Sequence, residues 1–273
     1  MSVKSILVHV GPDRRLGLPL EPIVRLAEDF GATLIGIGAG LPRPSVELGV
    51  TSFATATLIE DERQRIEADL NDAEALFRAK VAGANVAAEW RTIIGFPVAA
   101  IAEAADAADL IVARNNVGWM DRDVYQGIAP GDLLMAAGRP VLIVHPDCPR
   151  IATDTVLVAW KDTRESRRAI ADALPFLKRS KTVILLHAPE GGDAPSSADA
   201  RAFLVRHGIN VQSETLPRAS GAISDRILDF AERSHADLIV AGAYGHSRAR
   251  EWILGGVTKA LLDSSKIPCL LSH

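Results

Sequence analysis

The sequence Ala-Asp-Leu-Ile-Val-Ala occupies residues 108–113 and recurs unchanged at residues 236–241. Each copy contains a short apolar run with no alternating polar residues. Such a run is typical of a β-strand buried on both faces, as in a parallel sheet covered by helices. Because the two copies lie in different halves of the chain, they also raise the question of an internal duplication.

Two further pairs of segments match in the same order as the hexapeptides. Pro140-Val-Leu-Ile-Val-His145 corresponds to Pro268-Cys-Leu-Leu-Ser-His273, and Ile6-Leu-Val-His-Val10 corresponds to Val156-Leu-Val-Ala-Trp160. Chance does not account for three matching segments in one order. The sequence therefore predicts two domains, residues 1–150 and residues 151–273.

Short apolar runs alternate with longer amphipathic stretches through both halves. In the second half this pattern predicts strands at 155–160, 183–188, 209–215, 238–242 and 268–272, with helices at 164–178, 197–207, 220–234 and 256–265. The first half has equivalent strands at 4–10, 33–38, 86–93, 109–113 and 140–144, and helices at 20–30, 58–82, 97–107 and 128–137, with a loop at 39–57. The βαβαβαβαβ order predicts an α/β fold with two doubly wound, mainly parallel five-stranded sheets flanked by helices.

The composition excludes several classes of protein. Apolar residues make up 48% and charged residues 23% of the 273 residues, as expected for a folded globular chain. A net charge of −4 argues against a general nucleic-acid binder. No apolar run is long enough to span a membrane, and the start lacks a secretory signal. A cytoplasmic location is therefore expected, and the seven histidines show no metal-ligand spacing.

The segment best suited to chemistry follows the strand at 238–242. Gly242 and Gly245 are followed, after nine residues, by Gly255 and Gly256. Glycines let backbone N–H groups approach a phosphate closely, and the start of the following helix favours an anion. The other candidates for contact with phosphate are His246, Arg248, Val257 and Thr258. Glycines that only permit turns are the alternative interpretation, and no Walker A or dinucleotide motif is present.

Two such repeats with this glycine-rich segment resemble tandem universal stress proteins, a family with an adenine nucleotide alpha hydrolase-like fold. Its nucleotide-binding members carry G-x2-G-x9-G-[ST] between the fourth strand and fourth helix. Gly242, Gly245 and Gly255 match this pattern, and Gly256 stands at the Ser/Thr position. The resemblance implies ATP, AMP or ADP as ligand, with Mg²⁺ accompanying ATP, although no residue pattern requires a metal.

The resemblance also assigns the base and ribose, and the contact between the halves. Ala159, Trp160 and His187 would lie near the base and ribose, and Asp162 is the nearest acidic candidate for the ribose. Lys161 stands where the family has an acidic residue, and either meets a phosphate or projects into water. The last strands, 140–144 and 268–272, would pair as an intrachain pseudo-dimer, and a further homodimer is left open.

The first half departs from the pattern at the equivalent loop. Arg114 and Val117 replace the two earlier glycines, and Pro130 replaces Thr258. Side chains would fill the space that phosphates need, so we expect this half to bind no nucleotide in that way.

These observations leave two main functional hypotheses. In the first, the protein is a stress-response module in which the second domain holds an adenine nucleotide and partner or oligomer contacts read out its occupancy. No general base is evident, so slow hydrolysis is the most that is expected. In the second, the protein is a ligand-free interaction protein, which Lys161 and Gly256 favour. A nucleotide-activating enzyme is disfavoured, because neither half has a glycine-rich loop after its first strand.

Overall fold

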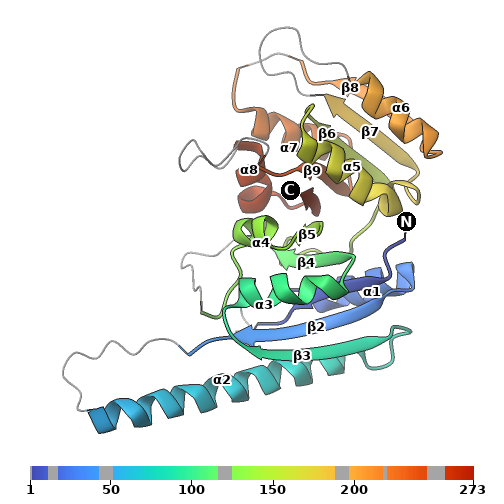
Figure 1. Ribbon diagram of the computed structural model, residues 1–273. Coiled ribbons are helices and arrows are strands. Elements are labelled where there is room, and N and C mark those ends of the chain that lie inside the picture. Colours follow the sequence, from blue (N-terminus) through green and yellow to red (C-terminus); the bar gives the residue numbers. More distant parts are fainter. Residues whose placement is uncertain are drawn as a thin grey trace.

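The computed structural model describes residues 2–11, 18–42, 52–115, 125–187, 197–217, 220–244 and 256–273, with side chains of the longest helix from residue 60 onward. The elements of the first half are β1 (Ser5–His9), α1 (Leu20–Phe30), β2 (Thr33–Gly40), α2 (Ser52–Val81), β3 (Ala88–Ile94), α3 (Pro97–Ala104), the short 3-10 helix η2 (Ala105–Ala107), β4 (Leu110–Arg114), α4 (Pro130–Ala136) and β5 (Val141–Val144). Those of the second half are β6 (Thr155–Trp160), α5 (Arg164–Leu177), β7 (Thr182–His187), α6 (Ala198–Arg206), β8 (Val211–Thr215), α7 (Ile223–Arg233), β9 (Leu238–Gly242), α8 (Gly256–Ser264) and β10 (Cys269–Ser272). Figure 1 shows this order from blue to red.

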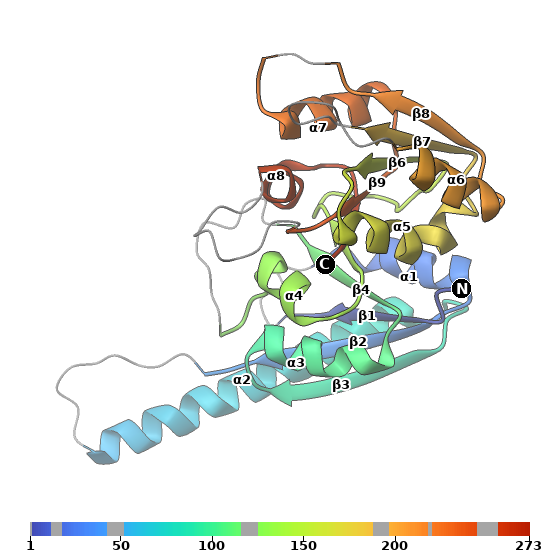
Figure 2. The same ribbon diagram turned by 45° about the horizontal axis from the view of Figure 1, so that its top comes forward.

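A single ten-stranded sheet runs through the molecule, in the order β3-β2-β1-β4-β5-β10-β9-β6-β7-β8. Neighbouring strands are parallel except β5 and β10, which pair antiparallel with Leu142 opposite Leu270. The expected pairing of the last strands is therefore confirmed, and it joins the two predicted five-stranded sheets into one. We call the β5–β10 pair, which joins the two halves shown in Figure 2, the seam. The division into two domains stays a prediction.

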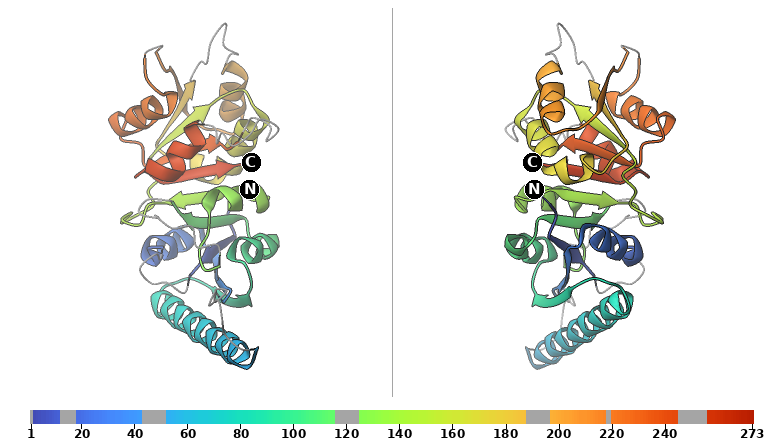
Figure 3. Two further views of the ribbon diagram at one scale, coloured as in Figure 1. Left: turned by 90° about the vertical axis from the view of Figure 1, so that its left-hand side faces the viewer. Right: turned by 90° about the vertical axis from the view of Figure 1, so that its right-hand side faces the viewer.

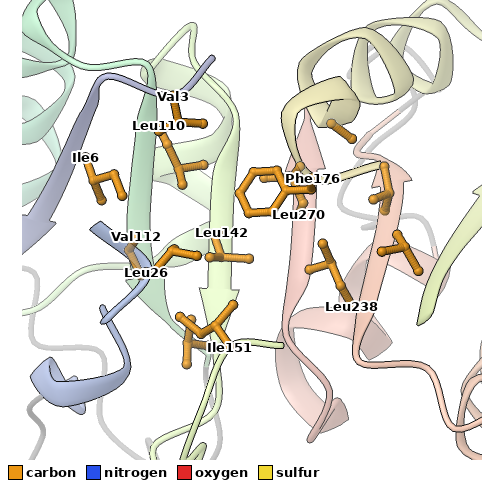
Figure 4. Packing of buried hydrophobic residues seen from close by; sticks show 14 of the residues in the cluster. Val3, Ile6, Leu26, Leu110, Val112, Leu142, Ile151, Phe176, Leu238 and Leu270 are labelled. Carbon is orange, nitrogen blue, oxygen red and sulfur yellow. The ribbon is translucent and has the colours of Figure 1, made fainter. Parts of the chain in front are cut away.

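Helices cover both faces of this sheet, as Figure 3 shows from two sides, so the predicted α/β fold class is confirmed. One apolar cluster holds buried residues of α1, α2, α5 and α6, and a second holds those of α3, α4, α7 and α8. The first cluster is continuous across the seam, where Leu142, Phe176 and Leu270 lie close together (Figure 4). Each fully buried side chain of this size contributes about 2 kcal/mol, so the seam is a substantial part of the core.

The repeated hexapeptide has a shared structural role that explains its aspartate. Asp109 accepts a hydrogen bond from the backbone nitrogen of Ser5 at 3.1 Å, and Asp237 accepts one from that of Thr155 at 2.9 Å. In each case the carboxylate satisfies the first backbone N–H of a neighbouring parallel strand. The two halves thus use the same contact to align their first and fourth strands.

The longest helix begins earlier than its sequence pattern indicates. We expected a loop over 39–57 and a helix over 58–82, whereas β2 extends to Gly40 and α2 begins at Ser52. The periodic apolar positions that locate the helix are Ile66, Leu70 and Phe77, which are buried, whereas its first turns extend beyond the sheet (Figure 1). Apolar periodicity marks the turns that pack on the core, so the sequence pattern located the later part of α2. Among the described residues, no helix is both long and apolar enough to cross a bilayer.

Candidate functional site

The carboxyl ends of β6 and β9 lie side by side, with Ala159 opposite Ala241. The chain leaves β6 into α5, which packs in the first apolar cluster, and the next helix after β9 is α8, which packs in the second. The strand order therefore reverses between β6 and β9, and the connections diverge to opposite faces of the sheet. Ligands of open α/β sheets bind in the crevice formed at such a point. We call the space at these two strand ends the crevice.

Gly242, the first glycine of the predicted motif, lies directly against the first turn of α5. A Cβ atom there would be 2.5 Å from the backbone nitrogen of Ser166 and 2.9 Å from the Cβ of Glu165. Real Cβ atoms essentially never come this close to backbone atoms. Gly242 is therefore required by the close approach of helix and strand, which sequence reasoning had assigned to the approach of a phosphate.

Among the described residues, the start of α8 is open on the side where a Cβ would lie at Gly256. This glycine is exposed, and an added Cβ would meet no described atom within 4 Å. Val257 is half-buried and packs on the second apolar cluster. Thr258 is buried, and its Oγ1 accepts a long hydrogen bond, 3.4 Å, from the backbone nitrogen of Tyr244. The helix start is thus tied to the segment after β9, and within the described part of the chain nothing lies against the Cβ position of its first residue.

Tyr244 connects the segment after β9 to the first half of the chain, a contact that sequence reasoning missed. Its backbone is left-handed, with φ of 58°, which is unusual for a residue other than glycine. An added Cβ at Gly131, in α4, would lie 2.4 Å from the Tyr244 hydroxyl oxygen. The ring also packs edge-on to His273, whose Nδ1 is 3.1 Å from the carbonyl of Ala243. In the sequence, this contact is indicated by the glycine at position 131, which leaves room for the Tyr244 hydroxyl.

The predicted base and ribose residues after β6 lie on different sides of the sheet. Ala159 is half-buried and packs on the cluster that contains α8, whereas Trp160 is buried in the cluster that contains α5. Among the described residues, the Trp160 indole nitrogen has no hydrogen-bond partner. Asp162 accepts a hydrogen bond from Arg167 at 2.8 Å on the surface. Lys161 is half-buried, and its carbonyl accepts from the backbone nitrogen of Thr163.

Glu165, in the first turn of α5, carries a buried carboxylate that sequence reasoning overlooked. Its side chain is only 4% exposed, Oε1 accepts from Arg164, and Oε2 has no partner among the described residues. Burial alone would raise the pKa of this carboxyl. Hydrogen bonds from Arg164, its own backbone and Thr163 outweigh burial, so the pKa is lowered and the group is charged at neutral pH.

The remaining predicted residues are only partly placed. His187 ends β7 in register with Trp160, is half-buried, and accepts through its carbonyl from Leu216 at 2.8 Å. Gly245, His246, Arg248 and Gly255 lie outside the described residues. The structure therefore brings Ala159, Gly242 and the start of α8 to one edge of the sheet.

The equivalent edge of the first half is filled by a histidine. His9, at the end of β1, is buried, and its Nε2 lies 3.2 Å from the carbonyl of Ala39. An added Cβ at Gly11 would lie 3.1 Å from the His9 ring. Arg114 is half-buried at the end of β4 and Pro130 begins α4, whereas Val117 lies outside the described residues. His9, which we had not singled out, thus adds bulk where its counterpart Ala159 leaves room.

The comparisons with known proteins agree with this fold. The model of the universal stress protein family matches residues 152–273. Among solved structures, a universal stress protein from Archaeoglobus fulgidus DSM 4304 superposes with a TM-score of 0.73 at 19% identity, over 98% of this chain and 96% of that chain. A functionally unknown protein from Pseudomonas aeruginosa PAO1 gives a TM-score of 0.58 at 18% identity, over 99% and 92%. These identities show a shared fold. No curated protein matches. The resemblance is thus supported by a family match for the second half, and a second domain of this family in residues 1–150 stays a prediction.

Proposed function

We propose that the second half of the chain binds an adenine nucleotide, with ATP, ADP and AMP as the candidates, in the crevice at the ends of β6 and β9. One observation carries the proposal. The strand order reverses between these two strands, and α8 starts nearby with no described residue within 4 Å of a Cβ placed on Gly256. The family match to residues 152–273 supports a nucleotide, because the glycine pattern belongs to that family's nucleotide-binding members.

The start of α8 would hold the phosphates. Its first backbone N–H groups have no partners within the helix, and the helix dipole favours a negative charge there. The hydroxyl of Thr258 accepts from the backbone nitrogen of Tyr244, so its own proton remains available to a phosphate oxygen. Mg²⁺ would enter with ATP, since the described residues include no group of three or more His, Cys, Asp or Glu side chains that could hold a metal.

The base would lie against Ala159 and the end of β7. Ala159 is small and packs on the same cluster as α8, so a ring placed there would be close to the phosphate site. The side chain of Trp160 packs in the opposite cluster, so it is not part of the proposed base pocket. Asp162 would reach a ribose only by leaving Arg167.

Tyr244 gives this site a route to the first half of the chain. It follows β9 directly, and its hydroxyl lies against Gly131 at the start of α4. A nucleotide that repositions the segment between β9 and α8 would therefore change the contact of Tyr244 with α4. We propose that, through this contact, binding of the nucleotide alters the surfaces that meet a partner or another copy of the chain, as expected of a stress-response module.

Calorimetric titration with ATP, with and without Mg²⁺, tests the proposal. We expect saturable binding by the wild-type protein and its loss in Gly245→Val. Gly256→Ser is the matched control, because it adds a hydroxyl in open space and should bind at least as well. A nucleotide that binds only the folded protein also raises the melting temperature. Absence of saturable binding and of a thermal shift at millimolar ATP would overturn the proposal, as would unchanged binding by Gly245→Val.

Glu165 favours a second candidate function, that of an interaction protein without a nucleotide. The Cβ of Glu165 lies against Gly242 and its carboxyl is charged at neutral pH, and a negative charge close to the crevice disfavours a triphosphate there. The titration separates the two functions. If Glu165→Gln creates ATP binding that the wild-type protein lacks, the natural protein is the ligand-free module.

A further inference from the structure

A separate hollow of about 470 Å³ lies at the opposite edge of the sheet from the crevice. One wall is the connection from β5 to β6, from His145 to Arg150, and the other is formed by the residues that precede β9 and β10. Because β9 and β10 run parallel to β6, their starts lie at the far edge from the ends of β6 and β9. The volume is within the range of small-molecule sites, about 300–1,000 Å³.

Two cations in the walls of this hollow have no partner among the residues that the structure describes. Arg150 lies in the connection and Lys266 precedes β10, and both are exposed. No ion pair or side-chain hydrogen bond joins either cation to another described residue. Two acidic residues also line the hollow, and neither is paired with these cations. Asp237 accepts a hydrogen bond from the backbone nitrogen of Thr155, and the Asp147 side chain is 91% exposed.

His145 adds a ring N–H donor to the same lining. Its Nδ1 accepts a hydrogen bond of 3.1 Å from the backbone nitrogen of Asp147, so Nε2 is the ring nitrogen that carries a proton. Its side chain is 11% exposed, which fixes the ring in the wall. The rest of the lining includes Ile267 and Pro268, so cationic and N–H donors stand beside apolar surface. A few convergent polar groups beside apolar surface are typical of a ligand site.

We propose that this hollow binds a small phosphomonoester through Arg150 and Lys266, with the carbon body of the ligand against Ile267 and Pro268. A phosphomonoester carries nearly two negative charges at neutral pH, which match the two unpaired cations. The planar guanidinium of Arg150 can donate two parallel hydrogen bonds to phosphate oxygens, and Lys266 supplies a point charge. Bound ligand would bridge the inter-half connection and the starts of β9 and β10.

Calorimetric titration with glycerol 3-phosphate, inorganic phosphate and succinate tests the proposal. Glycerol 3-phosphate should bind saturably and more tightly than the other two. Arg150→Gln and Lys266→Gln should each weaken its binding about tenfold, as expected for the loss of one charge-assisted hydrogen bond. Lys178→Gln is the matched control, since this exposed lysine follows α5 outside the hollow and should bind as the wild-type protein does.

Binding of glycerol 3-phosphate to the hollow should not depend on the nucleotide site in the crevice. The same titration on Gly245→Val, which removes the proposed nucleotide site, should give unchanged binding of glycerol 3-phosphate. Tighter binding of succinate would overturn the phosphomonoester as the ligand. Equal weakening by Lys178→Gln would show attraction by overall charge rather than a site. Absence of saturable binding at millimolar ligand would overturn the proposal entirely.

Discussion

Gly242 and Ser166 are held so close that an added Cβ on the glycine would lie 2.5 Å from the serine backbone nitrogen. The end of β9 and the start of α5 thus meet without an intervening side chain. This contact places the first turn of a helix over the crevice, and it makes the first glycine of the motif a packing residue irrespective of any ligand.

Gly242→Ala should therefore destabilise the protein, because the first turn of α5 must move. We expect a loss of about 1–3 kcal/mol in the free energy of unfolding, the usual cost of overpacking. Gly256→Ala, with open space around its Cβ, is the control and should change stability little. Urea denaturation followed by circular dichroism measures both, and equal stabilities would contradict the close approach.

Thr258→Val should loosen the segment after β9. The substitution keeps the shape but removes the acceptor of the Tyr244 N–H, at a cost of about 1 kcal/mol. Thr258→Ser keeps the hydroxyl and should restore most of the stability. Hydrogen exchange at the Tyr244 amide reports the change directly. Equal protection of that amide in Val and Ser variants would show that the 3.4 Å contact stabilises nothing.

His9 should make stability depend on pH in the weakly acidic range. Burial lowers its pKa from 6.5 to about 4, and the Ala39 carbonyl offsets this only in part. Between these pH values the unfolded chain binds a proton that the folded protein excludes. The stabilising effect is therefore complete above pH 6.5 and decreases as pH falls to 4, by about 3 kcal/mol in total.

His9→Gln removes this titration and should flatten the pH dependence of the free energy of unfolding between pH 6.5 and 4. The comparison uses the slope of the two proteins, because the substitution changes the absolute stability as well. Parallel slopes would show that His9 is not the group that titrates.

Ionisation of Asp172 should lower the free energy of unfolding as pH rises. Burial raises its pKa, although the Ser272 hydroxyl, at 2.8 Å, and Arg168 and Arg139 pull it down in part. A raised pKa means that the folded state prefers the protonated form, so the contribution is present at low pH and is lost as pH rises through that pKa.

Asp172→Asn keeps an acceptor for Ser272 and carries no charge, so at pH 7 it should be at least as stable as the wild-type protein. Asp172→Ala leaves the hydroxyl of Ser272, which is 1% exposed, without its acceptor and should lose about 1–3 kcal/mol. Thermal unfolding of the three proteins at pH 7 gives the order. An asparagine variant less stable than alanine would contradict this account.

Local sequence patterns located most helices and strands, because the spacing of apolar residues in an element reflects which of its residues are buried. The strand expected at 155–160 is observed as Thr155–Trp160, and the helix expected at 164–178 as Arg164–Leu177. The start of α2 at Ser52 was missed because no apolar periodicity marks a turn that leaves the sheet.

The candidate site was less predictable because its contacts join distant segments. Gly242 was singled out correctly but for another reason, since nothing local shows that Ser166 lies against it. Tyr244 meets Gly131 across the two halves, and the buried carboxylate of Glu165 reads as an ordinary helical residue until the helix is placed. Contacts of this kind depend on tertiary packing, which residue spacing does not encode.

The antiparallel pair of β5 and β10 has a consequence for which amino-acid substitutions this protein can accept during evolution. A strand edge that pairs with its own copy must be complementary to itself, so every substitution is met by the same substitution across the twofold axis. Here Ile143 faces Cys269 and Val141 faces Leu271, two different edges on one covalent chain. The sequence of each strand can therefore change independently, provided that the two strands still fit each other. Because both strands belong to one chain, dilution cannot separate them.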